Sequence, residues 1–200
     1  MPWSEDHKQA TRGRIVEAAA RAIREHGPDG VSVAAIMKSV GLTHGGFYAH
    51  FESKEALIAE ALSHATDETL AWLDRTATTA KDGQTAALAD IADAYLSNIH
   101  CEHPDRGCVL AACGTELARA DDLARIACSD NVRAYLRWLG QRSRAEQRGE
   151  RTREATGALA AMIGGMVLAR ATEDPAEARK ILAAVRGFVR GALKADKGAG

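Results

Sequence analysis

The chain has 200 residues, 46% of them hydrophobic, and a formal net charge of −1 at pH 7. This length can bury a full core in one large helical domain or two smaller lobes, and a composition rich in Ala and Leu with only four prolines favours helix over sheet. The polar start excludes a secretory signal, the longest apolar run, residues 158–169, is too short to span a bilayer, and four cysteines without disulfide-scaffold spacing indicate a reducing compartment. We therefore expect a soluble, cytoplasmic, all-α protein without a membrane partner and without a bulk positive field for nucleic acid.

Residues 11–26 predict an amphipathic helix. Ile15 and Ile23 share an apolar face, whereas Arg24 is expected with the other charged residues outside that face. The Gly-Pro-Asp-Gly run at residues 27–30 ends the helix. This helix is expected to pack over the segment that follows.

Residues 31–54 predict two short helices joined by a tight turn. Apolar residues recur at helical spacing from Val33 to Val40, and Ser32 precedes them as an N-cap. Gly41 then ends the first helix, because glycine enters the left-handed conformation without a Cβ clash. Such a pair is a helix-turn-helix, whose second helix enters the major groove of DNA.

The second short helix begins after Thr43, a good N-cap residue, and places Phe47 and Phe51 four residues apart on its buried side. Its exposed face then carries small or hydrogen-bonding residues, namely Thr43, His44, Gly45, Tyr48 and His50. A face of this kind suits DNA.

The run GLTHGGFYAHFESKEAL, residues 41–57, resembles the DNA-binding signature of the tetracycline-repressor (TetR) family of transcriptional regulators. Residues 11–27 resemble the first helix of that family, and residues 30–36 the entry into the second. The resemblance implies an all-helical, homodimeric repressor with a small-molecule pocket outside the head. We expect an N-terminal helix-turn-helix head at residues 1–52 and a helical effector-binding and dimerisation domain at residues 53–200, about nine helices in all.

The predicted DNA contacts lie in and around the two short helices. Tyr48 follows buried Phe47 and must point outward, where its hydroxyl can reach a phosphate, and helix N-termini also suit phosphate. Base readout falls to His44, with glycines beside it that allow close approach. The predicted contacts are Ser32, Thr43, His44, Gly45, Gly46, Tyr48, His50 and Lys54. The alternative is that these residues are ordinary caps and surface polar groups.

After the head, a long helix from Ser53 to about residue 79 is capped by Ser53 and ended by the Lys-Asp-Gly run at residues 81–83. The remaining helices are predicted at residues 85–100, 108–120, 123–143, 152–171 and 177–193, with a loop at residues 101–107.

A small-molecule effector is expected to bind in an apolar cavity among the middle helices. The residues predicted to line it are Trp72, Tyr95, Ile99, Val109, Leu110, Tyr135, Leu139 and Met162. Each of them, taken alone, is more typical of a plain core position than of a ligand contact, and they do not identify the ligand.

A second group of chemically versatile residues comprises His100, Cys101, Glu102, His103, Cys108 and Cys113. These residue types could coordinate zinc or another transition metal, which stays an alternative. Because the group contains no Cys-x-x-Cys pair and bridges a helix end and a loop, we predict neither a metal site nor a cofactor. Cys108 follows Arg106 and opens a predicted helix, and both features favour a reactive thiolate. The Gly-Cys pair here is similar to that of electrophile- and oxidant-sensing members of the family. A buried structural cysteine is the alternative.

The two last helices are the candidate dimer interface. The paired glycines at residues 164 and 165 cost about 1 kcal/mol each relative to alanine, which close helix–helix approach would offset. In the family, the last two helices of each subunit form a four-helix interface. The resemblance therefore implies contacts by Leu159, Ile163, Gly164, Met166, Val185, Phe188 and Val189. The alternative is that the glycines pack inside one subunit.

The function expected from these patterns is a ligand-responsive transcriptional regulator, most simply a repressor that binds a double-stranded palindromic operator as a homodimer and releases it on binding a small molecule. One alternative is a thiol-based sensor that uses Cys108. Another is an all-helical interaction module that does not bind DNA. No nucleophile triad, phosphate loop or metalloprotease motif is present, so an enzyme is not expected.

Overall fold

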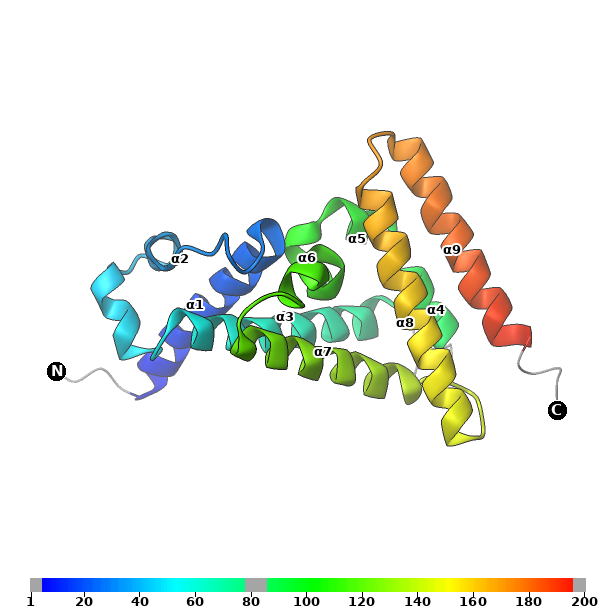
Figure 1. The fold of residues 1–200 in the computed structure, drawn as a ribbon, viewed down its shortest axis with the longest axis horizontal. Helices are drawn as coiled ribbons and strands as arrows, with labels where there is room; N and C mark the ends of the chain where they lie inside the picture. Colours follow the sequence, from blue (N-terminus) through cyan, green and yellow to red (C-terminus); the bar gives the residue numbers. More distant parts are fainter. Residues whose placement is uncertain (1–4, 78–85, 196–200) are drawn as a thin grey trace. The chain divides into compact units, whose positions relative to one another are not determined.

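The structure is a computed structural model that describes residues 5–77 and 86–195 (Figure 1). These residues form helices and connecting turns, without a strand among them. In chain order the helices are α1 (Glu5–His26), α2 (Val33–Ser39), the 3-10 helix η1 (His44–Ala49), α3 (Lys54–Thr76), α4 (Leu88–Tyr95), α5 (Asn98–Glu102), the 3-10 helix η2 (Pro104–Arg106), α6 (Val109–Leu117), α7 (Asp122–Gly140), α8 (Arg148–Arg170) and α9 (Pro175–Ala195). The expected all-α class is confirmed. Within the described ranges, no helix has both the length and the apolar character needed to cross a membrane.

The chain packs as two compact units, each built from two stretches of sequence. The first comprises Met1–Asp67 and Asp105–Asn131, and the second Glu68–Pro104 and Val132–Gly200. The first unit contains the whole predicted head and adds the start of α3, all of α6 and the start of α7 to it. The functional boundary expected after residue 52 stays a prediction.

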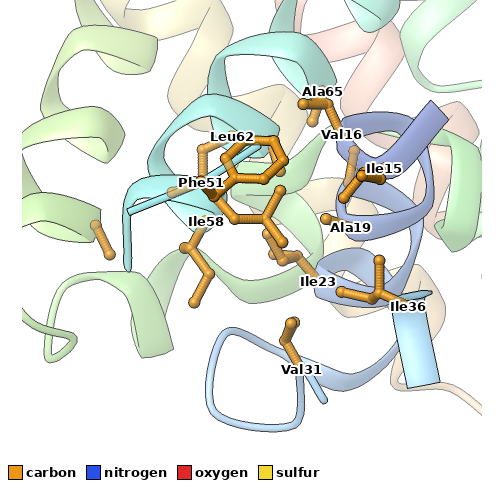
Figure 2. Packing of buried hydrophobic residues seen from close by; sticks show 14 of the residues in the cluster. Ile15, Val16, Ala19, Ile23, Val31, Ile36, Phe51, Ile58, Leu62 and Ala65 are labelled. Atoms are coloured by element: carbon orange, nitrogen blue, oxygen red, sulfur yellow. The ribbon is translucent and has the colours of Figure 1, made fainter. Parts of the chain in front are cut away.

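The core of the first unit forms where α1 packs against α2 and α6 (Figure 2). Ile15, Ile23 and Leu62 are completely buried, as is Val109 of α6. Burial of such a side chain contributes about 1.5–3 kcal/mol relative to full exposure. The apolar face predicted for the first helix is therefore confirmed as the centre of this core.

Arg24 departs from the prediction for the same helix. It was expected outside the apolar face, yet only 6% of it is exposed. Its guanidinium donates hydrogen bonds to the carbonyl oxygens of Ala65, at 2.9 Å, and Asp105, at 3.5 Å. The prediction failed because chain segments distant in sequence cover this side of α1, and they supply the acceptors that a buried guanidinium requires.

In the second unit, α8 and α9 run antiparallel side by side as a helical hairpin (Figure 1). Helix α4 packs against both of them, and α5 packs against α8. Arg186 of α9 donates a hydrogen bond of 2.6 Å to the carbonyl oxygen of Leu96. This bond ties the hairpin to the end of α4.

The single helix expected at residues 85–100 is two helices, α4 and α5. The Ser97 hydroxyl accepts a hydrogen bond from the His100 amide at 3.3 Å and so caps α5. The buried His100 ring is 2.6 Å from the carbonyl oxygen of Tyr95 through Nδ1, and thus occupies an acceptor that a continuous helix would use. These two side-chain bonds offer the backbone an alternative to a continuous helix. The predicted helix start at residue 85 and the stop at residues 81–83 lie outside the described residues, and α3 ends at Thr76.

Candidate nucleic-acid interface

Helix α2 and the turn after it have the local structure that the sequence predicted. The Ser32 hydroxyl accepts a hydrogen bond from the Ala35 amide at 3.3 Å and caps the helix. Gly41 has φ +76°, in the left-handed region. The Leu42 amide donates to the carbonyl oxygen of Met37 at 2.8 Å, which closes the helix end. The predicted cap and glycine turn are confirmed.

Helix α1 holds the end of α2 in place. The Arg14 guanidinium donates a hydrogen bond of 2.7 Å to the carbonyl oxygen of Val40, the C-cap residue of α2. This bond satisfies a carbonyl group that the helix itself leaves unpaired. The contact spans 26 positions, so helical periodicity could not have revealed it.

The second short helix is a 3-10 helix, η1, rather than an α-helix. The Gly46 amide bonds to the carbonyl oxygen of Thr43 at 3.1 Å, and the His50 amide to that of Phe47 at 2.9 Å. Two consecutive glycines lower the α-helical propensity here. Thr43 is the N-cap residue, but its side chain makes no capping hydrogen bond.

The buried side of η1 is fixed by two stacked aromatic rings. Phe47 is 1% exposed and Phe51 is 3% exposed, and their ring centroids are 5.6 Å apart at an interplanar angle of 21°. Stacked aromatic pairs at this distance add stability beyond their buried area. The predicted orientation of both rings is confirmed, and the opposite side of η1 must face solvent.

That solvent-facing side presents Tyr48 and His44. Tyr48 is 68% exposed and His44 is also exposed, with the two ring centroids 6.4 Å apart in an edge arrangement. A Cβ atom built on Gly45 would meet no atom within 4 Å, so the backbone here is open to close approach. Of the other predicted contacts, Ser32 and Thr43 are exposed, and Gly46, His50 and Lys54 are partly buried.

His50 lies near two cationic side chains, Lys8 and Arg12, of which Lys8 was not expected in this region. Its Nδ1 atom is buried and has no hydrogen-bond partner among the described residues. Burial is the largest cause that lowers the pKa of His50, followed by the positive charges of Lys8 and Arg12. Arg12 also pairs with Glu60 at 2.6 Å. The prediction missed Lys8 because it began the first helix at residue 11, whereas the i, i+4 spacing of these two cations was available as a signal.

The model of the family described as bacterial regulatory proteins, tetR family, matches residues 15–61, which include α2, η1 and most of α1. A crystal structure of a TetR transcriptional regulator from Chloroflexus aurantiacus is 26% identical, with a TM-score of 0.70, and the match covers 92% of this chain and 96% of that one. The chain belongs to the TetR family. The curated relatives of this TetR-family chain match its head alone.

Two of those relatives illustrate the extent of the match. The HTH-type transcriptional repressor Rv1474c of Mycobacterium tuberculosis is 32% identical over 72 residues, which are 36% of this chain and 38% of the relative. The HTH-type transcriptional regulator UidR of Escherichia coli is 41% identical over 63 residues, 32% of each chain. The chain thus spans about a third of the length of the curated relatives it matches.

The residues predicted to line the effector pocket are divided between the two units. Val109 and Leu110 belong to the first, and the other six to the second. All are buried or half-buried except Ile99, which is 67% exposed and therefore lies outside the predicted buried set. Cavities of about 170, 320 and 350 Å³ occur in the described part of the second unit, and none of these three is lined by a predicted pocket residue. The pocket assignment stays a prediction.

Cys108 is the N-cap residue of α6, as its predicted position at a helix start required, but it is 0% exposed. Arg106 pairs with Asp105 at 3.3 Å and extends into solvent. A sensing role for Cys108 stays a prediction, and it would require the start of α6 to open. Within the described ranges, no three His, Cys, Asp or Glu side chains gather in a possible metal site.

Two other thiols near Cys108, those of Cys113 and Cys128, have raised pKa values. Burial, with the charge of Glu116 as the second cause, raises the pKa of the Cys113 thiol to about 12. Burial also raises the pKa of Cys128. Cys113 donates to the carbonyl oxygen of Val109 at 3.4 Å, consistent with a neutral thiol.

The predicted dimer residues separate into two sets. Leu159, Met166 and Val189 are buried within the subunit, because the facing stripes of α8 and α9 pack on each other. Ile163 and Val185 are half-buried, whereas Gly164 and Phe188 are exposed, Phe188 to 68%. Gly165, not Gly164, makes the close approach inside the subunit, where its Cβ position is 3.0 Å from two carbon atoms of Val185.

Proposed function

We propose that this chain is a DNA-binding transcriptional regulator that represses from a palindromic operator as a homodimer and releases it when a small molecule binds. The observation that carries the proposal is the exposed pair of Tyr48 and His44 on a segment whose opposite side is anchored by Phe47. The names of the curated relatives, a repressor and regulators of the HTH type, support it. Its partner would be double-stranded DNA, and its compartment the cytoplasm.

In this proposal, phosphate contacts position the head and His44 reads a base edge. The Tyr48 hydroxyl and the Lys54 ammonium group are donors to phosphate, and the exposed Ser32 and Thr43 lie at helix starts. His44 is the exposed ring beside Gly45, where nothing obstructs approach of the backbone to the major groove.

The proposed dimer uses the outer face of the α8–α9 hairpin. Val167, Leu168 and Phe188 are 46%, 60% and 68% exposed, and Gly164 lies on the same helix as the first two. Large exposed apolar side chains on two helices that pack together favour a protein interface on this hairpin. Pairing this face with its copy would fix two heads at the spacing of neighbouring major grooves, ~34–36 Å.

Release by a ligand requires that the ligand binds the released conformation more tightly than the DNA-bound one. Helix α3 offers a continuous mechanical element for this, because it begins at Lys54 beside the reading segment and continues to Thr76. The effector would therefore act by changing the position of α3.

The test is a mobility-shift titration with a palindrome from the promoter beside the gene, at several salt concentrations. Three or four phosphate contacts per subunit predict a slope of log affinity against log salt of roughly −5 to −7. Tyr48→Phe should weaken binding to every sequence alike, and His44→Ala should change the preference among sequences. The matched control is His26→Ala, which replaces an exposed histidine at the C-terminal end of α1. Parental binding by both the Tyr48 and the His44 variants would refute the reading face.

DNA binding should also depend on pH through His50. Its pKa is lowered in the free protein, by burial and then by Lys8 and Arg12, and a bound phosphate nearby would raise it again. Binding should therefore take up protons, so affinity rises as pH falls from about 7.5 to about 6. The measurement is the operator affinity across this range, where His50→Gln should flatten the dependence and His26→Gln should not. An unchanged dependence in the His50 variant would contradict the contact.

A further inference from the structure

The start of α1 lies beside the turn that joins η1 to α3 (Figure 1). Arg12 of α1 makes the contact, with its guanidinium 4.1 Å from the centre of the Phe51 ring, two residues after η1. The same guanidinium pairs with Glu60 of α3 at 2.6 Å. Arg12 is therefore held by an aromatic ring on one segment and by a carboxylate on the next. These two contacts fix the first turns of α1 against the end of η1.

Lys8 lies one turn before Arg12 on α1, and the i, i+4 spacing places both side chains on the same face of the helix. Burial is the largest cause that lowers the pKa of His50, and the charge of Lys8 is the second, ahead of that of Arg12. Because Coulomb interactions weaken with distance, this effect agrees with the position that the Arg12 contacts give to Lys8. The Lys8 side chain thus lies near His50, the C-cap residue of η1.

Lys8 is available to an external partner, whereas the guanidinium of Arg12 is already engaged. Lys8 is exposed, and within the described ranges it makes no ion pair and no hydrogen bond. The exposed carboxylates of the same segments, those of Glu5, Asp6 and Glu52, are not at ion-pair distance from it. They reduce the local positive charge but leave the ammonium group accessible. An ammonium group of this kind binds a phosphate as a point charge.

We propose that Lys8 contacts a phosphate of the DNA backbone beside the half-site that η1 reads. The proposed function, on which this step rests, places η1 in the major groove. That groove is about 12 Å wide and has a phosphate strand on either side. A cation held at one end of η1 therefore meets one of these strands, and its contact positions the head without reading the sequence. Lys8 thus adds one phosphate contact per subunit to those of Tyr48 and Lys54.

The position of Lys8 is tested without DNA, by NMR titration of the His50 imidazole in the full-length protein. The resonance is assigned by its loss in His50→Gln. Lys8→Gln removes a positive charge and should raise the pKa of His50. Lys180→Gln, which replaces an exposed lysine of α9 and changes the net charge equally, should leave this pKa unchanged. An unchanged pKa of His50 in Lys8→Gln would place the ammonium group elsewhere and overturn the proposal.

The contact itself is tested by operator titrations at several salt concentrations. Lys8→Gln should weaken binding about threefold to tenfold at about 0.1 M salt, and the salt slope of the dimer should become less steep by about two. The preference among operator sequences should stay the same. Lys8→Arg keeps the charge and should bind like the parent, as should Lys180→Gln. Parental affinity of Lys8→Gln would overturn the contact and leave the proposed function standing.

Neutral methylphosphonate groups, placed at one phosphate at a time, identify the phosphate that Lys8 contacts. One position in each half-site should cost the parent protein about threefold or more in affinity and cost Lys8→Gln nothing further, because the two changes remove the same interaction. Equal sensitivity of the two proteins at every position would overturn the contact. Failure of the parent protein to bind any operator would instead refute the proposed function, and this contact with it, whatever the NMR titration shows.

Discussion

Replacing Gly164 by leucine should convert the protein into a folded monomer, whereas the same change at Gly165 should destabilise the subunit. A Cβ atom at Gly164 would meet no atom within 4 Å, so the subunit has room for the new side chain. A Cβ atom at Gly165 would lie 3.0 Å from both γ carbons of Val185 on α9. Two adjacent glycines thus give opposite expectations, one for association and one for folding.

The magnitudes separate the two variants clearly. Gly165→Leu forces α8 and α9 apart and should lower the free energy of unfolding by about 1–3 kcal/mol or more. Gly164→Leu removes a helical glycine and should raise the intrinsic stability of α8 by up to about 1 kcal/mol. Its operator affinity should nevertheless fall steeply, because a monomer has one head and half the phosphate contacts.

Sedimentation at micromolar concentration reports the association state of each variant, and thermal unfolding reports its stability. Gly157→Leu is a further variant on the exposed side of α8. A Cβ atom at Gly157 also meets nothing within 4 Å, and Gly157 lines the groove beside Phe188. A Gly164→Leu protein that remains dimeric would place the interface elsewhere on the molecule.

Replacing the buried Arg24 by methionine should strongly destabilise the protein. Methionine keeps the unbranched apolar stem of the side chain but removes the donors to the carbonyl oxygens of Ala65 and Asp105. Because Arg24 is 6% exposed, water cannot replace these bonds, and the free energy of unfolding should fall by about 2–4 kcal/mol. Lysine should rescue little, since an ammonium group cannot reach two separated acceptors as a guanidinium does.

The matched control for Arg24 is Arg21→Met, one turn earlier on α1. Arg21 is exposed and lies 4.0 Å from Glu17, a pair that contributes under about 1 kcal/mol. Urea unfolding of both variants gives the comparison, and equal m-values would show that the unfolded states match. An Arg24→Met protein as stable as the Arg21 variant would mean that the two carbonyl bonds carry no stability.

The sequence by itself determined the local structure of the helix-turn-helix at residues 31–54, because each of its features depends on residues a few positions apart. Ser32 caps the residues that follow it, Gly41 turns the chain at a left-handed φ, and four-residue spacing brings Phe47 and Phe51 together. Once Phe47 is buried, the next residue, Tyr48, must point away from the core. The family match to residues 15–61 covers this same locally encoded stretch.

The tertiary structure decided everything that depends on which face meets which. Helical spacing placed Gly164 and Gly165 together, but only the position of α9 shows that Gly165 packs inside the subunit. Helical spacing placed Cys108 at a helix start, but only the packing of the folded chain shows that it is buried. The same spacing grouped Arg24 with the exposed charged residues, whereas in the structure two carbonyl groups from distant segments accept its hydrogen bonds.

The cavity lined by Leu88, Arg142 and Leu193 shows the same limit most clearly, because its residues come from four segments between residues 87 and 193. A local pattern fixes the direction of a side chain relative to its own helix, whereas burial and site geometry depend on contacts between helices far apart in sequence. For that reason the exposed face of η1 was predictable from the sequence, whereas the burial of the Arg142 side chain was visible only in the folded chain.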